Sequence, residues 1–270
     1  MKLGIAVSTY SSSFPYIVYN GGDMKSILQQ IQGLGYEGVD LFVGYLSERE
    51  IDELGDLYAQ YHIEVANYLP MALSGTGGSF TDVDWARRES YLTGYKREME
   101  MAARLDTQCM PVGFSRGPKA PDRSWRHYFD TLADSLMELW EYGEKLGITI
   151  CLEPINRFEA NTLNSTQECL SFLDEYDLSG VRLLLDIFHI NIEDASIRQS
   201  ILDAGDKIGH FHAADTNRYG AGKGHADFDD LIGALTQARY TGYLSMEAKA
   251  LSDPYTCAKE CASFLRPKMS

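Results

Sequence analysis

Short apolar segments alternate with longer helix-like segments about eight times along the chain. The apolar segments have the length of buried strands and occupy residues 3–8, 38–42, 63–68, 108–112, 148–153, 181–186, 208–212 and 243–247. Helices are predicted at 24–34, 48–61, 84–105, 125–146, 165–176, 195–204, 227–239 and 253–265. Strands joined by helices of this length pair in parallel through right-handed crossovers. Eight such units in 270 residues predict an α/β fold, a closed (β/α)8 TIM barrel that takes up residues 1–270 as a single domain.

Composition restricts the partners that such a barrel can have. The formal net charge of −15 argues against nucleic acid and against anionic membranes, because both select basic surfaces. No apolar run approaches the roughly 20 residues of a membrane span. The N-terminus leads straight into the first predicted strand, so we expect no signal peptide and a cytoplasmic protein. The five cysteines lack the spacing of a zinc cluster, and we expect core or helix-face thiols.

Four residues with metal-binding side chains end the last four apolar runs. They are Glu153, Asp186, His212 and Glu247, separated by 33, 26 and 35 residues. In a parallel barrel these strand ends meet at one rim, where three carboxylates repel each other unless a divalent cation lies between them. Any one of them alone is as well explained by a helix cap or a loop ion pair. The coincidence of all four favours a metal site, and oxygen-rich ligation with one imidazole suits Mn²⁺, Mg²⁺ or Co²⁺.

The segments around these four residues resemble a known family. Glu-Pro-Ile-Asn-Arg-Phe-Glu at 153–159, Leu-Asp-Ile-Phe-His-Ile-Asn-Ile-Glu at 185–193, Gly-His-Phe-His at 209–212 and Ser-Met-Glu at 245–247 are similar to the signature blocks of the ketose 3-epimerases. That group includes the D-tagatose and D-allulose (psicose) 3-epimerases, within the xylose-isomerase-like barrel superfamily. The resemblance extends over residues 148–249 and more loosely over the whole chain.

The resemblance implies a catalytic domain that is a divalent-metal-dependent epimerase. It implies inversion of C3 of a ketohexose or ketopentose by removal and return of a proton through a metal-bound cis-enediolate. Glu153 and Glu247 are then the acid/base pair and also ligate one ion together with Asp186 and His212, with Mn²⁺ expected first and Co²⁺ or Mg²⁺ as alternatives. A small-molecule sugar is the expected partner, and a homo-oligomer, a dimer or tetramer, is the expected assembly.

Four further residues are predicted substrate contacts. By resemblance His189 and Arg218 contact the substrate oxygens near C1 to C3, and Glu159 bonds substrate hydroxyls. His210 shares its strand face with His212, so we expect it inside the barrel below the metal, where it orients a ligand or touches substrate. A core histidine and a solvated loop charge are the plainer interpretations of His189 and Arg218.

The first half of the chain is less informative. Aromatic residues follow the first predicted strand (Tyr10, Phe14 and Tyr19), end the third (Tyr68) and lie on or near the fourth loop (Phe114, Trp125 and Tyr128). They could form an apolar wall against the distal carbons of a sugar, although core packing explains any single one of them. The fourth loop and the start of its helix carry four positive charges, Arg116, Lys119, Arg123 and Arg126. They permit a phosphorylated or carboxylated substrate, because arginine binds such anions by paired hydrogen bonds. Exposed surface charges are the plainer interpretation.

Several other functions compete with the epimerase. The first is an aldose–ketose isomerase acting on a sugar or sugar phosphate, in the manner of hydroxypyruvate isomerase, with the same metal site. An inosose-type dehydratase is a further variation on proton abstraction. An endonuclease needs additional ligands for two or three zinc ions and a basic face, which six histidines and a charge of −15 disfavour. A non-catalytic sugar-binding barrel is the last alternative.

Overall fold

A computed structural model describes residues 1–269, and in it eight parallel strands close into a barrel. Neighbouring strands pair in chain order, and the last pairs back onto the first. These strands are β1 (Lys2–Ser8), β3 (Gly38–Val43), β4 (Glu64–Pro70), β5 (Cys109–Val112), β6 (Thr149–Leu152), β7 (Arg182–Asp186), β8 (Ile208–His212) and β9 (Tyr243–Met246). A two-residue strand, β2 (Tyr19–Asn20), lies beside β1 outside the closed ring. The predicted (β/α)8 barrel is confirmed.

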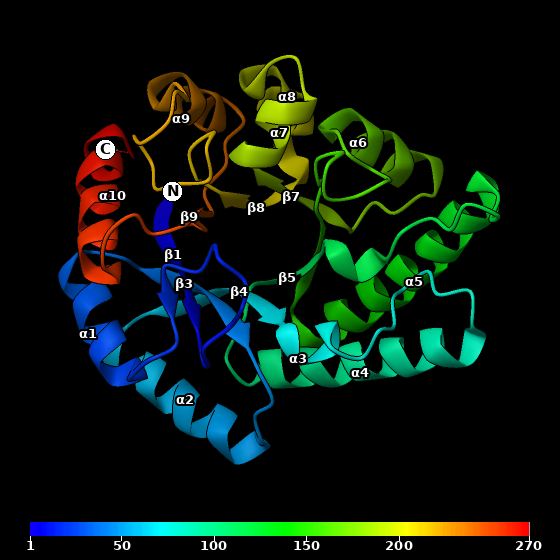
Figure 1. Ribbon diagram of the computed structural model, residues 1–270, viewed down its shortest axis with the longest axis horizontal. Coiled ribbons are helices and arrows are strands. Elements are labelled where there is room, and N and C mark those ends of the chain that lie inside the picture. Colours follow the sequence, from blue (N-terminus) through cyan, green and yellow to red (C-terminus); the bar gives the residue numbers. More distant parts are fainter. Residues whose placement is uncertain (270) are drawn as a thin grey trace.

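Eight helices form the outer ring around the strands (Figure 1). They are α1 (Met24–Gly33), α2 (Glu48–Tyr61), α4 (Trp85–Ala103), α5 (Trp125–Leu146), α6 (Thr166–Glu175), α8 (Ile197–Ala204), α9 (Phe228–Gln237) and α10 (Pro254–Met269). Helices α2 and α6 each begin with a capping box, formed by Ser47 with Glu50 and by Ser165 with Glu168. These local signals explain why the predicted bounds are close to the observed ones.

Two features of the helices depart from the sequence prediction. Helix α10 was predicted to end at 265 but continues to Met269, which packs partly buried against the core and so holds the last turn. Four short helices were not predicted, namely α3 (Met71–Ser74), the 3₁₀ turns Phe114–Arg116 and Gly205–Lys207, and α7 (Ile187–Glu193). Of these, α7 matters most, because it follows β7 directly and lies at the carboxyl rim.

The interior of the barrel is more polar than the usual layers of valine, isoleucine and leucine. Asp40 from β3 and His210 from β8 meet inside the ring, although these strands are not neighbours in the sheet. Asn67 and Ser245 are also fully buried. Cys109, Cys151 and Leu184 form a small apolar cluster of their own. The layers beneath the carboxyl rim are therefore built partly from polar side chains.

Two predictions from composition can be checked against the described residues. All five cysteines are buried and free, in agreement with the expected core or helix-face thiols. Within residues 1–269, none of the helices combines the length and the apolar character that crossing a membrane requires.

Candidate metal centre

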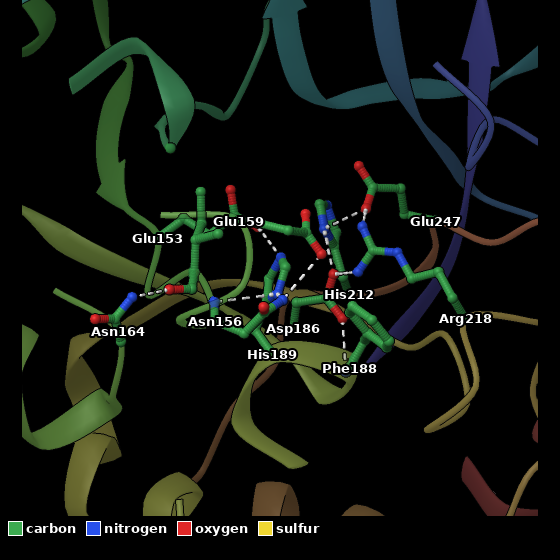
Figure 2. A network of polar contacts seen from close by, with 12 residues as sticks. Glu153, Asn156, Glu159, Asn164, Asp186, Phe188, His189, His212, Arg218 and Glu247 are labelled. Carbon is green, nitrogen blue, oxygen red and sulfur yellow. Dashed lines mark hydrogen bonds and ion pairs between the residues drawn. The ribbon is translucent and has the colours of Figure 1, made fainter. Parts of the chain in front are cut away.

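The four predicted ligands converge at the carboxyl rim (Figure 2). Glu153 follows β6, Asp186 ends β7, His212 ends β8 and Glu247 follows β9. The Nδ1 atom of His212 lies 3.5 Å from Glu247 Oε2 and 3.7 Å from Asp186 Oδ2. Glu153, Asp186 and His212 each offer one ligand atom within 4.8 Å of the other two. The structure thus brings together the four strand-end residues, as their spacing predicted, while their role as ligands stays a prediction.

Asp186 shows how the sequence builds this rim. Its carboxylate accepts a hydrogen bond of 2.9 Å from the backbone N–H of Phe188 and so serves as the N-cap of α7. The chain therefore passes from strand to helix without an intervening loop. His189 lies in the first turn of α7 and faces Glu153 at the mouth of the barrel, with 3.9 Å between His189 Nε2 and Glu153 Oε1.

A buried arginine lies between two of the carboxylates. The guanidinium of Arg218 donates to Asp186 Oδ2 and to Glu247 Oε2, and the residue is only 5% exposed. Its guanidinium also lies 4.5 Å from the ring centroid of Tyr16 and 5.0 Å from that of Phe188. Arg218 is therefore no solvated loop charge. Its guanidinium acts as a stand-in cation at the carboxylates that a divalent ion would share.

The donor atoms fit a divalent ion. Among the described residues, Nδ1 of His212 is buried without a hydrogen-bond partner and is directed at the carboxylates of Asp186 and Glu247. Carboxylate oxygens with one imidazole nitrogen are a donor set for hard or intermediate divalent metals. The group of Glu153, Asp186 and His212 is thus able to hold a metal ion. Glu247 lies beside it, and its place among the donors stays a prediction.

Burial and mutual repulsion disturb the protonation of the group. Burial, assisted by the negative charges of Glu247 and Asp186, raises the pKa of Glu153 to about 8. Burial also raises the pKa of Glu247. Burial opposes ionisation of Asp186 as well, but the Arg218 charge and the contact with His212 hold the pKa of Asp186 well below its usual range. Without an ion, the site therefore retains protons near neutral pH.

His189 is held in one tautomer by its neighbour. The side-chain amide of Asn156 donates to His189 Nδ1 at 2.8 Å, and the backbone N–H of Asn156 approaches the same nitrogen at 3.4 Å. Since Nδ1 accepts, the ring proton lies on Nε2, the nitrogen that faces Glu153. Burial lowers the pKa of His189 to about 4, so the ring is neutral. Asn156 was quoted within a signature block but had no predicted role.

A pocket of about 440 Å³ opens above the group. Glu153, Glu247, His189 and Arg218 form its polar part. The rest of the lining is largely apolar and includes Phe14, Phe42, Leu69, Met71 and Phe114. Of the aromatic residues expected to form an apolar wall, Phe14 and Phe114 belong to this lining, whereas Tyr10, Tyr19, Tyr68, Trp125 and Tyr128 lie outside it as described. The pocket has a charged floor on one side and a surface for carbon-rich parts of a ligand on the other.

Glu159 and His210, both predicted substrate contacts, lie outside the described pocket lining. Glu159 is exposed, accepts a hydrogen bond of 2.9 Å from Asn156, and borders a neighbouring depression. His210 is buried below His212 and lies 2.9 Å from Asp40. Asp40 was missed, although one signal was present, namely a charged residue in the middle of an apolar strand. For His210 the geometry favours orientation of a neighbour, the other role considered from the sequence.

The interpretation of the fourth-loop cations as exposed charges is wrong for two of them. Arg116 and Arg123 are 2% and 9% exposed. Arg116 donates to four loop carbonyls, those of Gly113 at 3.0 Å, Glu153 at 2.8 Å, Thr162 at 2.8 Å and Leu163 at 3.4 Å. The reason is that the loops after β5 and β6 leave buried carbonyl oxygens that need donors. Both arginines are therefore structural, and Arg116 fixes the backbone of Glu153.

Comparison with known proteins fits this geometry. A family model described as Xylose isomerase-like TIM barrel matches residues 28–268. The chain belongs to this family. Among its relatives, the 3-dehydro-D-guloside 4-epimerase of Escherichia coli K12 is 28% identical over 87% of this chain and 91% of that protein. The D-psicose 3-epimerase of Agrobacterium fabrum is 27% identical over 82% of this chain and 77% of that protein. The L-ribulose 3-epimerase of a Methylomonas species is 38% identical over 42% of this chain and 40% of that protein.

Solved structures show the same xylose isomerase-like barrel. A crystal structure of a 3-keto-D-glucoside 4-epimerase from E. coli superposes with a TM-score of 0.81 at 25% identity, covering 98% of this chain and 100% of that chain. A D-psicose 3-epimerase crystallised in the presence of D-fructose superposes with a TM-score of 0.83 at 22% identity, covering 100% of this chain and 99% of that chain. The latter likeness supports the fold alone.

The loop that carries Arg218 is organised by Asp215, which had no predicted role. This carboxylate is 1% exposed and accepts backbone N–H groups of Thr216 at 2.8 Å, Gly222 at 2.9 Å and Ala226 at 3.1 Å. Arg218 itself has a φ of 64°, a left-handed conformation that a non-glycine residue adopts only when its surroundings impose it. Asp215 supplies much of that constraint.

Replacing Asp215 by Asn should therefore destabilise the protein. The amide offers one oxygen in place of two charged acceptors and places an NH₂ against backbone donors, so we expect a loss of about 2–4 kcal/mol in the free energy of unfolding, measured by urea denaturation. Asp203→Asn is the control, because Asp203 is exposed and, in the described part of the chain, its carboxylate accepts a hydrogen bond from the Gln199 side chain alone. Equal stability of the two variants would contradict this account.

Metal binding should depend on pH. Because the pKa of Glu153 is raised to about 8, this carboxyl is protonated at lower pH and must lose its proton to bind an ion. We expect the affinity for Mn²⁺ to weaken as the pH falls from about 8 to about 6, by up to about tenfold per pH unit for each proton released. Titration calorimetry in two buffers of different ionisation enthalpy measures both the Mn²⁺ affinity and the number of protons released on binding. An affinity that is constant over this range, without proton release, would refute the expectation.

Proposed function

We propose that this chain is a divalent-metal-dependent epimerase of a keto sugar, which inverts the carbon next to the ketone and acts first of all on C3 of a ketose. The observation that carries the proposal is the placement of two buried glutamates around one pocket. Glu153 and Glu247 come from strands separated in the ring by β7 and β8, and both line the pocket (Figure 2). Inversion requires a base on one face of the carbon and an acid on the other.

The protonation of the two glutamates suits this task. A proton beside a ketone is weakly acidic, and the bound ion supplies Lewis-acid stabilisation of the charge that develops on the oxygens. One glutamate removes the proton, and the other delivers a proton to the opposite face. Burial raises the pKa of Glu153 to about 8, so this carboxyl is able to hold a proton near neutral pH. Burial also raises the pKa of Glu247. The configuration of the substrate decides which of them begins as the base.

His189 and Arg218 are the proposed substrate-binding residues. His189 is neutral and directs its Nε2–H toward Glu153 and the pocket, where it donates to a substrate oxygen. Arg218 lines the same pocket with its guanidinium at Asp186 and Glu247. If Asp186 and Glu247 hold the ion, Arg218 would be released from them, and its N–H groups would then donate to oxygens of the sugar. We further propose one Mn²⁺ for each chain, with Co²⁺ and Mg²⁺ as alternatives, and residues 1–270 as one catalytic domain.

A second candidate substrate shares this chemistry. In a 3-keto glycoside C4 is one of the two carbons next to the ketone, and the same proton transfers at C4 would make the protein a 4-epimerase. This candidate is favoured by the match to the E. coli 3-dehydro-D-guloside 4-epimerase, which extends over 91% of that protein's length. Both candidates present an α-hydroxyketone to the ion and the two glutamates. The two substrates differ in the remaining part of the sugar, which the rest of the pocket has to accommodate.

The test is hydrogen exchange on a panel of keto sugars. Metal-stripped and Mn²⁺-reloaded protein is incubated in deuterated water with free ketoses and with 3-keto glycosides, and the products are identified by NMR. We expect metal-dependent deuterium, with inverted configuration, at the carbon beside the ketone. Deuterium at C1 or C2 of an aldose product would instead indicate an isomerase. Metal binding without exchange on any sugar would refute the proposal.

Glutamine variants test the two glutamates. We expect Glu153→Gln and Glu247→Gln each to lower the epimerisation rate by roughly 10²–10⁴-fold, because each removes one of the two proton-transfer groups. Glu175→Gln is the matched control, since Glu175 is exposed and, within residues 1–269, its one ion pair is with Arg126 at 3.3 Å. Rates are measured with saturating Mn²⁺, so that weaker metal binding does not mask the effect. A wild-type rate in either site variant would contradict the assignment.

A further inference from the structure

The barrel interior holds a second buried group beneath the proposed ligands. Asp40 is fully buried, and its two carboxylate oxygens are each engaged by one imidazole. His210 Nε2 lies 2.9 Å from Asp40 Oδ1, and His212 Nε2 lies 3.0 Å from Asp40 Oδ2. The two contacts have the length of hydrogen bonds without their ideal alignment. Asp40 comes from β3, which is not adjacent to β8 in the ring.

These three side chains are spaced closely enough to hold an ion of their own. The chemistry of His212 argues against it. Its Nδ1 is directed at Asp186 and Glu247, so a ring that binds an ion there keeps its single proton on Nε2, the nitrogen that faces Asp40. A nitrogen that carries a proton has no lone pair for a second ion. The buried carboxylate is then the partner of that N–H and not a ligand.

We propose that Asp40 is the positioning residue of the metal centre. Asp40 holds His212 in the Nε2–H tautomer, with Nδ1 turned toward the ion. A carboxylate that accepts a hydrogen bond from a metal-binding histidine fixes the orientation of the ring and makes the nitrogen that binds the metal a stronger ligand. His210 engages the second oxygen of Asp40 and so fixes the rotation of the carboxylate. This inference rests on the metal site of the proposed function, and it is independent of which sugar is turned over.

The same layer of the barrel offers a matched control. Asn67 on β4 is opposite Asp40 in the strand register and is equally buried. Among the described residues it forms no hydrogen bond or ion pair with either imidazole, and its carbonyl oxygen lies 3.7 Å from Cys109 Sγ. A substitution at Asn67 therefore disturbs the polar interior without removing the partner of His212.

The test measures metal affinity directly. Titration calorimetry with Mn²⁺ compares wild type, Asp40→Asn and Asn67→Ala, and metal analysis gives the number of ions bound. We expect one ion for each wild-type chain, roughly 10–100-fold weaker binding in Asp40→Asn, and affinity within about threefold of wild type in Asn67→Ala. Nitrogen-15 NMR of the Mg²⁺-loaded proteins should show His212 as Nε2–H in wild type and a mixture of tautomers in Asp40→Asn.

Each other outcome overturns the inference. Unchanged affinity and an unchanged tautomer in Asp40→Asn would show that Asp40 acts on stability alone. Two ions for each wild-type chain, one of them lost in Asp40→Asn, would make Asp40 a ligand. If Asp40→Asn does not fold, His210→Gln decides, with weaker Mn²⁺ binding expected and unchanged binding contradicting the role. A chain that fails to epimerise any sugar but shows these affinities would refute the proposed function and leave the inference standing.

Discussion

The electrostatic repulsion among buried carboxylates at the carboxyl rim governs the organisation of this barrel. Glu153, Asp186 and Glu247 are brought together by three strand ends, and each would be costly to bury as an isolated charge. Two side chains partly neutralise these negative charges. Arg218 reaches Asp186 and Glu247 from the loop after β8, and His212 lies between carboxylates above and Asp40 below. A proton retained on Glu153 removes a further negative charge from the group.

The residues around the carboxylates are held in place by side chains from the loops of the barrel. The loop of Arg218 is held by Asp215, and the backbone of Glu153 is held by the buried guanidinium of Arg116. Both anchors act on the loops at the carboxyl rim, where barrel enzymes place their active sites. Arg218 reaches its carboxylates from a loop, whereas Asp40 lies in a strand inside the barrel. The site thus combines a cation carried on a loop with a support carried on a strand.

Much of this arrangement could be predicted because it depends on local patterns. Alternation of apolar and helical segments gave the barrel, and the strand-end positions of Glu153 and Asp186 followed from it. Contacts between distant segments could not be predicted in the same way. The pairing of Asp40 with His210 and His212 crosses the barrel, and the burial of Arg116 depends on carbonyl groups of two other loops. Sequence alone shows the charge of such residues but not their partners.

The short helix α7 illustrates a further limit. Asp186 ends its strand and also caps the helix that begins at the next residue, so no loop signal separates the two elements. The sequence therefore indicated His189 as a residue near the site without indicating the helix that orients it. The same holds for Asn156, whose amide fixes the tautomer of His189. In both cases the residue type was informative, and the direction of the side chain required the structure.

The most direct test of the central claim is a crystal structure of the Mn²⁺-loaded protein, with the ion located by its anomalous scattering. The account predicts one anomalous peak within bonding distance of Glu153, Asp186, Glu247 and the Nδ1 atom of His212. It also predicts that the guanidinium of Arg218 no longer bridges Asp186 and Glu247. A peak at Asp40 and His210 instead, or an unoccupied rim with Arg218 still between the two carboxylates at saturating Mn²⁺, would contradict the account.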